Sequence, residues 1–200
     1  MGDGGAKGCF VAIVGPSGSG KDTLIEWLRE RLKEKPGCMF VRRIVTRAAD
    51  AQAEDHLTMS EAEFDQARSA GSFAVVWQAH GLSYGIPTEA AAHVANDGLA
   101  IGNGSRRALA AMRAAFGRFA VIELTVKPEI LAQRLAQRGR ESADEINARL
   151  ALKDIGVAND FAPFRVDNSG SVDDAGEAVL AYLATLSHHV GEERKTEQAK

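Results

Sequence analysis

The feature that most constrains the fold is the glycine-rich octapeptide Gly15-Pro-Ser-Gly-Ser-Gly-Lys-Asp22. The apolar run Cys9–Val14 precedes it, and such continuous apolarity is typical of a parallel strand buried on both faces. Residues 21–34 follow, with leucine and isoleucine at helical spacing. A strand, a glycine-rich turn and a helix in this order are the context of a Walker A phosphate loop.

This octapeptide is suited to phosphate for physical reasons. Glycines let successive backbone N–H groups face phosphate oxygens, the helix N-terminus adds positive potential, and Lys21 adds a full charge. The alternative, a glycine-rich turn with a surface lysine, does not account for the flanking strand and helix. We therefore expect nucleotide contacts from Gly15, Pro16, Ser17, Gly18, Ser19, Gly20, Lys21, Asp22 and Thr23.

One position of the octapeptide departs from the general motif. Asp22 stands where a serine or threonine usually follows the lysine, and Thr23 comes one step later. A carboxylate this close to a triphosphate repels it unless a divalent cation lies between them. Asp22 is thus a candidate Mg²⁺ ligand, direct or through water. The alternative is an acidic residue that complements the helix dipole.

The rest of the chain alternates between strand and helix patterns. Strands are expected near 39–46, 73–79, 99–101, 119–126 and 164–167, and helices near 60–70, 88–97, 105–116, 128–138, 142–159 and 172–187. This alternation predicts an α/β fold with a parallel sheet covered by helices on both faces. We expect a flexible N-terminus over 1–8, a single domain over 9–187 and a flexible charged tail over 188–200.

Composition excludes some partners. The 24 basic and 27 acidic residues give a net charge of -3, which argues against a nucleic-acid-binding surface. No apolar run approaches the ~20 residues that span a membrane, and no signal-peptide pattern opens the chain. Cys9 and Cys38 have no metal-binding or disulfide spacing, which favours a reducing, cytoplasmic setting. A homodimer stays open.

Arginines gather where two predicted strands end. Arg47 follows the strand near 39–46, and Arg106 follows the strand near 99–101. In open α/β sheets ligands bind beyond the carboxyl ends of the strands, and guanidinium groups bind phosphate in a bidentate way. Two such clusters fit a small acceptor with several phosphates. A GTPase is disfavoured, because the chain has no Asn-Lys pair for reading guanine.

Several segments together resemble the guanylate kinase superfamily: Gly15–Asp22, Arg43–Arg47, Glu54–His56, Ser60–Phe64 and His80–Gly85. Within it the chain is most similar to the ribose 1,5-bisphosphate phosphokinase family of phosphonate metabolism. The motifs that carry this narrower resemblance are Lys21-Asp22, Asn103–Arg106, Arg138–Glu141 and Glu145–Leu150. The resemblance covers most of residues 9–187 and implies a P-loop kinase of guanylate-kinase-like fold.

The resemblance also implies chemistry and residue roles. It implies ATP- and Mg²⁺-dependent phosphoryl transfer to a small phosphorylated sugar, ribose 1,5-bisphosphate, giving 5-phosphoribosyl 1-diphosphate (PRPP) and ADP. The implied catalytic residues are Lys21, Arg47, Arg138 and Arg149. Acceptor contacts are implied for Thr46, Arg47, Tyr84, Asn103, Ser105, Arg106 and Arg140, and nucleotide contacts for Arg138 and Asn168. The acceptor region spans about 47–85, and a mobile lid about 138–149.

Two departures separate the chain from true guanylate kinases. The family pattern carries a second arginine and a Gly-Glu pair after Thr46-Arg47, whereas Ala48–Ala53 contains no arginine. Asn103 stands where that family places an aspartate. A purine-reading pocket is therefore disfavoured, and the metal-binding carboxylate is expected at Asp22 instead. The alternatives are a guanylate or other nucleoside monophosphate kinase and, more remotely, a non-catalytic guanylate-kinase-like binding module.

Overall fold

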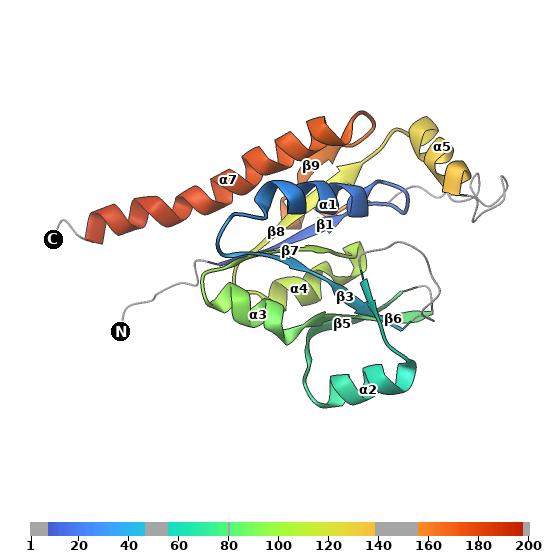
Figure 1. The fold of residues 1–200 in the computed structure, drawn as a ribbon, viewed down its shortest axis with the longest axis horizontal. Coiled ribbons are helices and arrows are strands. Elements are labelled where there is room, and N and C mark those ends of the chain that lie inside the picture. The colour runs from blue at the N-terminus through green and yellow to red at the C-terminus, as the bar shows by residue number, and fades with distance from the viewer. Residues whose placement is uncertain (1–7, 47–55, 80, 139–155, 198–200) are drawn as a thin grey trace.

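The computed structural model describes residues 8–46, 56–79, 81–138 and 156–197, and its strands form two sheets (Figure 1). Sheet A is five-stranded and parallel, in the order β2-β7-β1-β8-β9. Its strands are β1 (Cys9–Val14), β2 (Cys38–Val41), β7 (Leu99–Asn103), β8 (Phe119–Thr125) and β9 (Phe164–Asp167). The strand that precedes the phosphate loop is therefore the central one.

Helices cover both faces of sheet A, as the alternating pattern predicts. α1 (Lys21–Leu32) and α7 (Val172–Glu197) lie on one face, and α3 (Thr88–Ala95) and α4 (Leu109–Ala115) on the other. β1 supplies both cores: Phe10, Ala12 and Val14 pack with α3 and α4, and Val11 and Ile13 pack with α1 and α7. All five of these side chains have no exposed surface, so the central strand is fixed from both sides.

Sheet B is smaller and mixed, in the order β4-β3-β6-β5. It comprises β3 (Arg43–Val45), β4 (His56–Thr58), β5 (Phe73–Ala79) and β6 (Leu82–Pro87), with α2 (Glu61–Ser69) beside it. Ser60 and Glu63 form the predicted capping box: Ser60 Oγ accepts from the Glu63 N–H, and Glu63 Oε2 accepts from the Ser60 N–H. Sheet B packs through Val75, Trp77 and Ile86 into the same core as α3 and α4.

One predicted strand was wrong, and two strands, β4 and β6, were not predicted. The strand expected over 39–46 is two strands, because the chain leaves sheet A after Val41 and enters sheet B at Arg43. β6 was not predicted at all, since its Gly85 and Pro87 are typical of turns. Gly85 is needed inside this strand because a Cβ there would lie 2.6 Å from Cδ1 of Phe73.

Three predicted helix boundaries also differ. Residues 106–108 form a 3₁₀ turn before α4. The helix expected over 142–159 lies mostly outside the described residues, but 156–158 are not helical and 159–161 form a 3₁₀ turn. α7 continues to Glu197, ten residues beyond the expected end at 187, and it passes through Gly191 without a proline to end it. None of the described helices is long and apolar enough to cross a membrane.

Both cysteines are free, as their spacing predicts. Cys9 is buried on β1, and Cys38 is half-buried on β2. Burial raises the pKa of each thiol above its usual value, which disfavours the reactive thiolate. Both side chains therefore serve as small apolar groups in the core beside α1 and α7.

Candidate active site

The phosphate loop depends on backbone that glycine alone adopts easily. Gly20 caps the N-terminus of α1 with φ 86° and ψ 22°, in the left-handed region. A Cβ at this position would lie 2.5 Å from Nδ2 of Asn168. The first helical hydrogen bond, from the Leu24 N–H to the Gly20 carbonyl, is already formed at 2.9 Å. The loop therefore presents a helix N-terminus, as expected for a phosphate site.

Lys21 lies across this loop. Its ammonium donates to the carbonyls of Gly15 at 3.0 Å and Pro16 at 2.8 Å. These contacts place the charge at the side of the loop that faces the end of β1. The structure thus brings the lysine and the glycine-rich backbone together as predicted.

Asn168 holds the phosphate loop through a hydrogen bond to its backbone. Its Nδ2 donates to the Ser19 carbonyl at 2.7 Å, its own N–H donates to the Thr125 carbonyl at 2.8 Å, and it is 3% exposed. Next to it, hydrogen bonds from the hydroxyl and N–H of Ser169 hold the pKa of Asp167 below its usual value. The described contacts make Asn168 a positioning residue of the phosphate loop. Its contact with adenine stays a prediction.

Arg134 is a nearby cation to which no motif in the sequence assigned a role. It comes from α5 (Pro128–Arg138), and its Nη1 lies 3.8 Å from the position that a Cβ at Gly20 would occupy. This nitrogen is buried and has no hydrogen-bond partner among the described residues. A buried guanidinium donor beside a phosphate loop is suited to an anion. The signal in the sequence is its spacing, one helical turn before Arg138.

Asp22, in the first turn of α1, makes a hydrogen bond to the end of β7. Its Oδ1 accepts from Nδ2 of Asn103, the last residue of β7, at 2.8 Å. Asn103 Oδ1 accepts in turn from Nη1 of Arg43, the first residue of β3, at 3.2 Å. Two predicted site residues therefore touch each other. Arg43, the first residue of the segment Arg43–Arg47 that resembles guanylate kinases, joins them and had no predicted role of its own.

Two stacked aromatic side chains of sheet B lie beside Arg43. The Arg43 guanidinium carbon lies 5.4 Å from the ring centroid of Tyr84, and Tyr84 stacks on Trp77 at 5.3 Å. Thr46 is 8% exposed, and its Oγ1 accepts from the Ser83 N–H at 2.9 Å, so its hydroxyl also ties β3 to β6. The structure places Tyr84 on β6 and Thr46 directly after β3, the neighbouring strand of the same sheet.

The remaining predicted residues divide into two groups. Ser105 and Arg106 follow β7, where Ser105 Oγ accepts from the Arg107 N–H at 3.3 Å, and Thr23 lies exposed in the first turn of α1. Arg47, Arg140 and Arg149 lie outside the described residues. Arg138 ends α5, and its side chain is not described. Their roles stay predictions.

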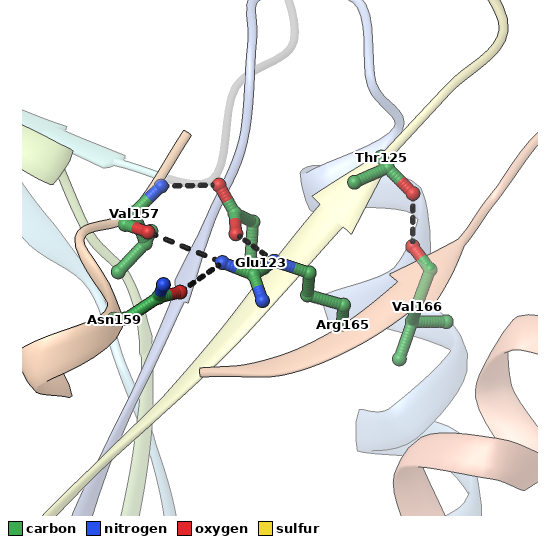
Figure 2. A network of polar contacts seen from close by, with 6 residues as sticks. All are labelled: Glu123, Thr125, Val157, Asn159, Arg165 and Val166. Atoms are coloured by element: carbon green, nitrogen blue, oxygen red, sulfur yellow. Dashed lines mark hydrogen bonds and ion pairs between the residues drawn. The ribbon is translucent and has the colours of Figure 1, made fainter. Parts of the chain in front are cut away.

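A buried carboxylate on β8 joins residues 157–159 to sheet A (Figure 2). Glu123 of β8 is 4% exposed, and its Oε1 accepts from the Val157 N–H at 2.6 Å. Its Oε2 accepts from Nε of Arg165 at 3.0 Å, and Arg165 Nη2 donates to the Val157 carbonyl and to Asn159 Oδ1. Every oxygen of this buried carboxylate is thus hydrogen-bonded, and residues 157–159 are fixed to β8 and β9.

Replacing Glu123 by alanine should destabilise the fold by about 1.5–3 kcal/mol, since it removes two hydrogen bonds to a charged group and leaves the Val157 N–H without its acceptor. Urea unfolding checks this, with Glu123→Gln as the matched control, because glutamine keeps an acceptor for Val157. An alanine variant with the wild-type free energy of unfolding would contradict the role of this network.

A metal site built from protein side chains alone is not found in the described part of the chain, where no three His, Cys, Asp or Glu side chains gather. Kinases usually hold Mg²⁺ through one or two carboxylates and the substrate phosphates. Asp22 fits that pattern: Asn103 occupies Oδ1, and the described residues give Oδ2 no hydrogen-bond donor. The residues present therefore fit a nucleotide-bound Mg²⁺ better than a resident metal.

Several known proteins that are similar to this chain carry one name. Ribose 1,5-bisphosphate phosphokinase PhnN of Agrobacterium fabrum is 47% identical over 174 residues, which are 87% of this chain and 95% of that protein. This chain belongs to the ribose 1,5-bisphosphate phosphokinase family. Family members from Rhizobium etli and Pseudomonas paraeruginosa are 43% and 44% identical, over 92% and 88% of this chain and 94% and 95% of those proteins.

Two broader comparisons agree with the fold of this family. Residues 11–151 match the family described as AAA domain. Guanylate kinase from Anaplasma phagocytophilum superposes with a TM-score of 0.58 at 16% identity, covering 88% of this chain and 84% of that one. The predicted guanylate-kinase-like P-loop fold is therefore confirmed, and so is the predicted family.

Proposed function

We propose that this chain is a kinase that transfers the γ-phosphoryl group of ATP to the 1-phosphate of ribose 1,5-bisphosphate, giving PRPP and ADP. The observation that carries the proposal is the convergence of Lys21 and Asp22, from the phosphate loop, with Asn103 and Arg43 at the ends of two other strands. The names of relatives 39–47% identical to the chain supply the acceptor. A place in phosphonate metabolism and in the cytoplasm follows as part of the proposal.

The phosphate loop would bind the donor. Backbone N–H groups at the start of α1 would donate to the β- and γ-phosphates, and Lys21 would exchange its contacts with the Gly15 and Pro16 carbonyls for phosphate oxygens. Arg134, and Arg138 from the same helix, would add guanidinium contacts to the nucleotide. Mg²⁺, held by Asp22 and the nucleotide phosphates, supplies neutralisation of the charge on the transferring group.

The acceptor needs no general base. Its attacking atom is an oxygen of an anionic phosphate, so no proton has to be removed before attack. The work left to the protein is alignment of two polyanions and stabilisation of charge. Tyr84, Thr46, Asn103, Ser105 and Arg106 would border the acceptor, and Arg47 and Arg140 would contact its phosphates. Such a site has to limit water, because an open site would hydrolyse ATP.

The alternatives fit the geometry less well. A binding module has no need for a lysine and a helix N-terminus arranged for a triphosphate. A guanylate kinase needs groups that read a purine, and the stretch after Arg47 lacks the arginine that helps hold GMP in that family. The kinase of a phosphorylated sugar therefore remains the better reading.

The reaction is tested by supplying the full chain with Mg·ATP and, in separate tubes, ribose 1,5-bisphosphate, GMP, dGMP, AMP and UMP. We expect ADP release to follow the sugar bisphosphate, with PRPP identified by phosphorus NMR as the coupled product. Lys21→Ala serves as the blank for contaminating kinases. Binding of ATP without transfer to any acceptor would favour the module instead.

A further inference from the structure

The contacts of Asn103 with Asp22 and Arg43 fix the orientation of its side-chain amide. Asn103 is 6% exposed, and its two polar atoms face opposite kinds of partner. Arg43 is a donor without an acceptor atom in its guanidinium, so it requires the amide oxygen. The Asp22 carboxylate accepts hydrogen bonds, so it requires the amide nitrogen. One orientation of the amide satisfies both partners, and the hydrogen bond from Arg43 favours the orientation that Asp22 requires.

Arg43 is itself held on a rigid support. Its guanidinium lies over Tyr84, and Tyr84 stacks nearly parallel on Trp77, with an interplanar angle of 9°. Trp77 is 8% exposed and packs in the core shared with α3 and α4. Three elements, β3, β5 and β6, therefore fix the direction in which Arg43 donates. A support of this kind lowers the entropy lost in forming the next hydrogen bond.

We propose that Arg43 is a positioning residue for the metal: through Asn103 it orients the Asp22 carboxylate so that Oδ2 faces the cation on the nucleotide. This inference rests on the proposed role of Asp22 as a Mg²⁺ ligand. In the Arg43–Asn103–Asp22 relay, we assign Asn103 as the link and Asp22 as the ligand. The oxygen of Asn103 accepts from Arg43 and its nitrogen donates to Asp22, and Mg²⁺ is usually held by carboxylates. Outer partners of this kind tune metal affinity by about 10–100-fold.

The relay also explains why an amide stands at position 103. The two hydrogen-bonding atoms of Asn103 and Asp22 are 2.8 Å apart. A carboxylate in place of the amide would set two negative charges at that distance and would leave Asp22 Oδ1 without its donor. With the ligand carboxylate in the phosphate loop, the end of β7 needs a donor.

The test measures ADP affinity by calorimetry with and without Mg²⁺, and takes the ratio of the two affinities as the metal effect. Arg43→Met removes the donors but keeps an apolar stem over Tyr84, and Asn103→Ala removes the relay itself. We expect each variant to reduce the metal effect about 10-fold or more. Affinity for metal-free ADP should stay near the wild-type value, which also shows that the variant is folded.

A double variant separates positioning from a general structural role. If Arg43 acts through Asn103, adding Arg43→Met to Asn103→Ala should change the metal effect by less than about twofold. Arg43→Lys, which keeps a charged donor, should recover part of the effect. The matched control is Arg68→Met, which removes an equal charge from an exposed ion pair with Asp65 on α2, and it should keep the wild-type metal effect.

The failures are distinguishable. A full metal effect in Arg43→Met, or additive losses in the double variant, would overturn the relay. Asp22→Asn with the wild-type metal effect would overturn the metal assignment and the relay together. Asp22→Asn without a metal effect, beside Arg43→Met with a full one, would overturn the relay alone. None of these measurements uses an acceptor, so an error in the acceptor shows only in the transfer assay.

Discussion

Replacing Lys21 by alanine should lower kcat/KM for phosphoryl transfer by about 10³–10⁵-fold, the range measured when one cation is withdrawn from the transferring group in related phosphoryl transfers. The ammonium already lies within the loop, bonded to the carbonyls of Gly15 and Pro16. Because it carries a full charge, no neutral backbone N–H replaces it. Steady-state rates of ADP release with ribose 1,5-bisphosphate measure the loss.

A matched lysine on the same helix serves as the control. Lys33, at the C-cap of α1, is exposed and forms an ion pair with Glu30 at 3.7 Å. Lys33→Ala should therefore keep wild-type kcat/KM within about twofold, since exposed ion pairs contribute little. Wild-type turnover in Lys21→Ala would contradict the assignment of Gly15–Asp22 as the donor site.

Replacing Gly20 by alanine should cost about 100-fold or more in kcat/KM. The residue has φ 86°, which disfavours alanine, and the added Cβ would lie 2.5 Å from Nδ2 of Asn168. Either the loop shifts or Asn168 leaves the Ser19 carbonyl, and both changes move the N–H groups that face phosphate. Displacements near 1 Å in a catalytic site can cost about 10²-fold. Steady-state kinetics measures the loss in kcat/KM, and calorimetric ADP binding measures the loss of affinity for the nucleotide.

Gly37 separates backbone strain from the clash. It also has a positive φ, 75°, but a Cβ there would meet nothing within 4 Å. Gly37→Ala should lower the free energy of unfolding by about 1–2 kcal/mol, the cost of left-handed backbone, and leave kcat/KM unchanged. Equal loss of activity in the two variants would mean that strained backbone destabilises the fold as a whole, and that the contact with Asn168 does not account for the loss.

The fold was predictable where local pattern and tertiary environment agree. β1 is apolar at every position because both faces of sheet A are covered, and β9 was predicted at its observed bounds, 164–167. Sheet B was harder. Apolar residues lie on both sides of Arg42 and Arg43 within 39–46, so this segment matches one strand as well as two, and β6 depends on Phe73 covering Gly85. Contacts of that kind join distant segments and leave no local pattern.

In the site too, residues within one segment could be predicted, whereas contacts between distant segments could not. The phosphate loop is contiguous, so Lys21 and Asp22 could be assigned from spacing alone. The hydrogen bond between Asp22 and Asn103 joins residues 81 positions apart, and the one between Arg43 and Asn103 joins residues 60 positions apart. Arg134 likewise gains its place from α5 and the phosphate loop meeting in space. Resemblance to a family supplied Asn103, but only packing explains why it is an amide.

The most direct test of the central claim is a competition in one tube between equimolar ribose 1,5-bisphosphate and GMP for limiting Mg·ATP. The ratio of the products equals the ratio of the two kcat/KM values, independent of enzyme concentration. We expect PRPP to exceed GDP by about 100-fold or more, because the groups that converge on the site bind phosphate and none of those identified reads a purine. GDP in excess over PRPP would contradict the account.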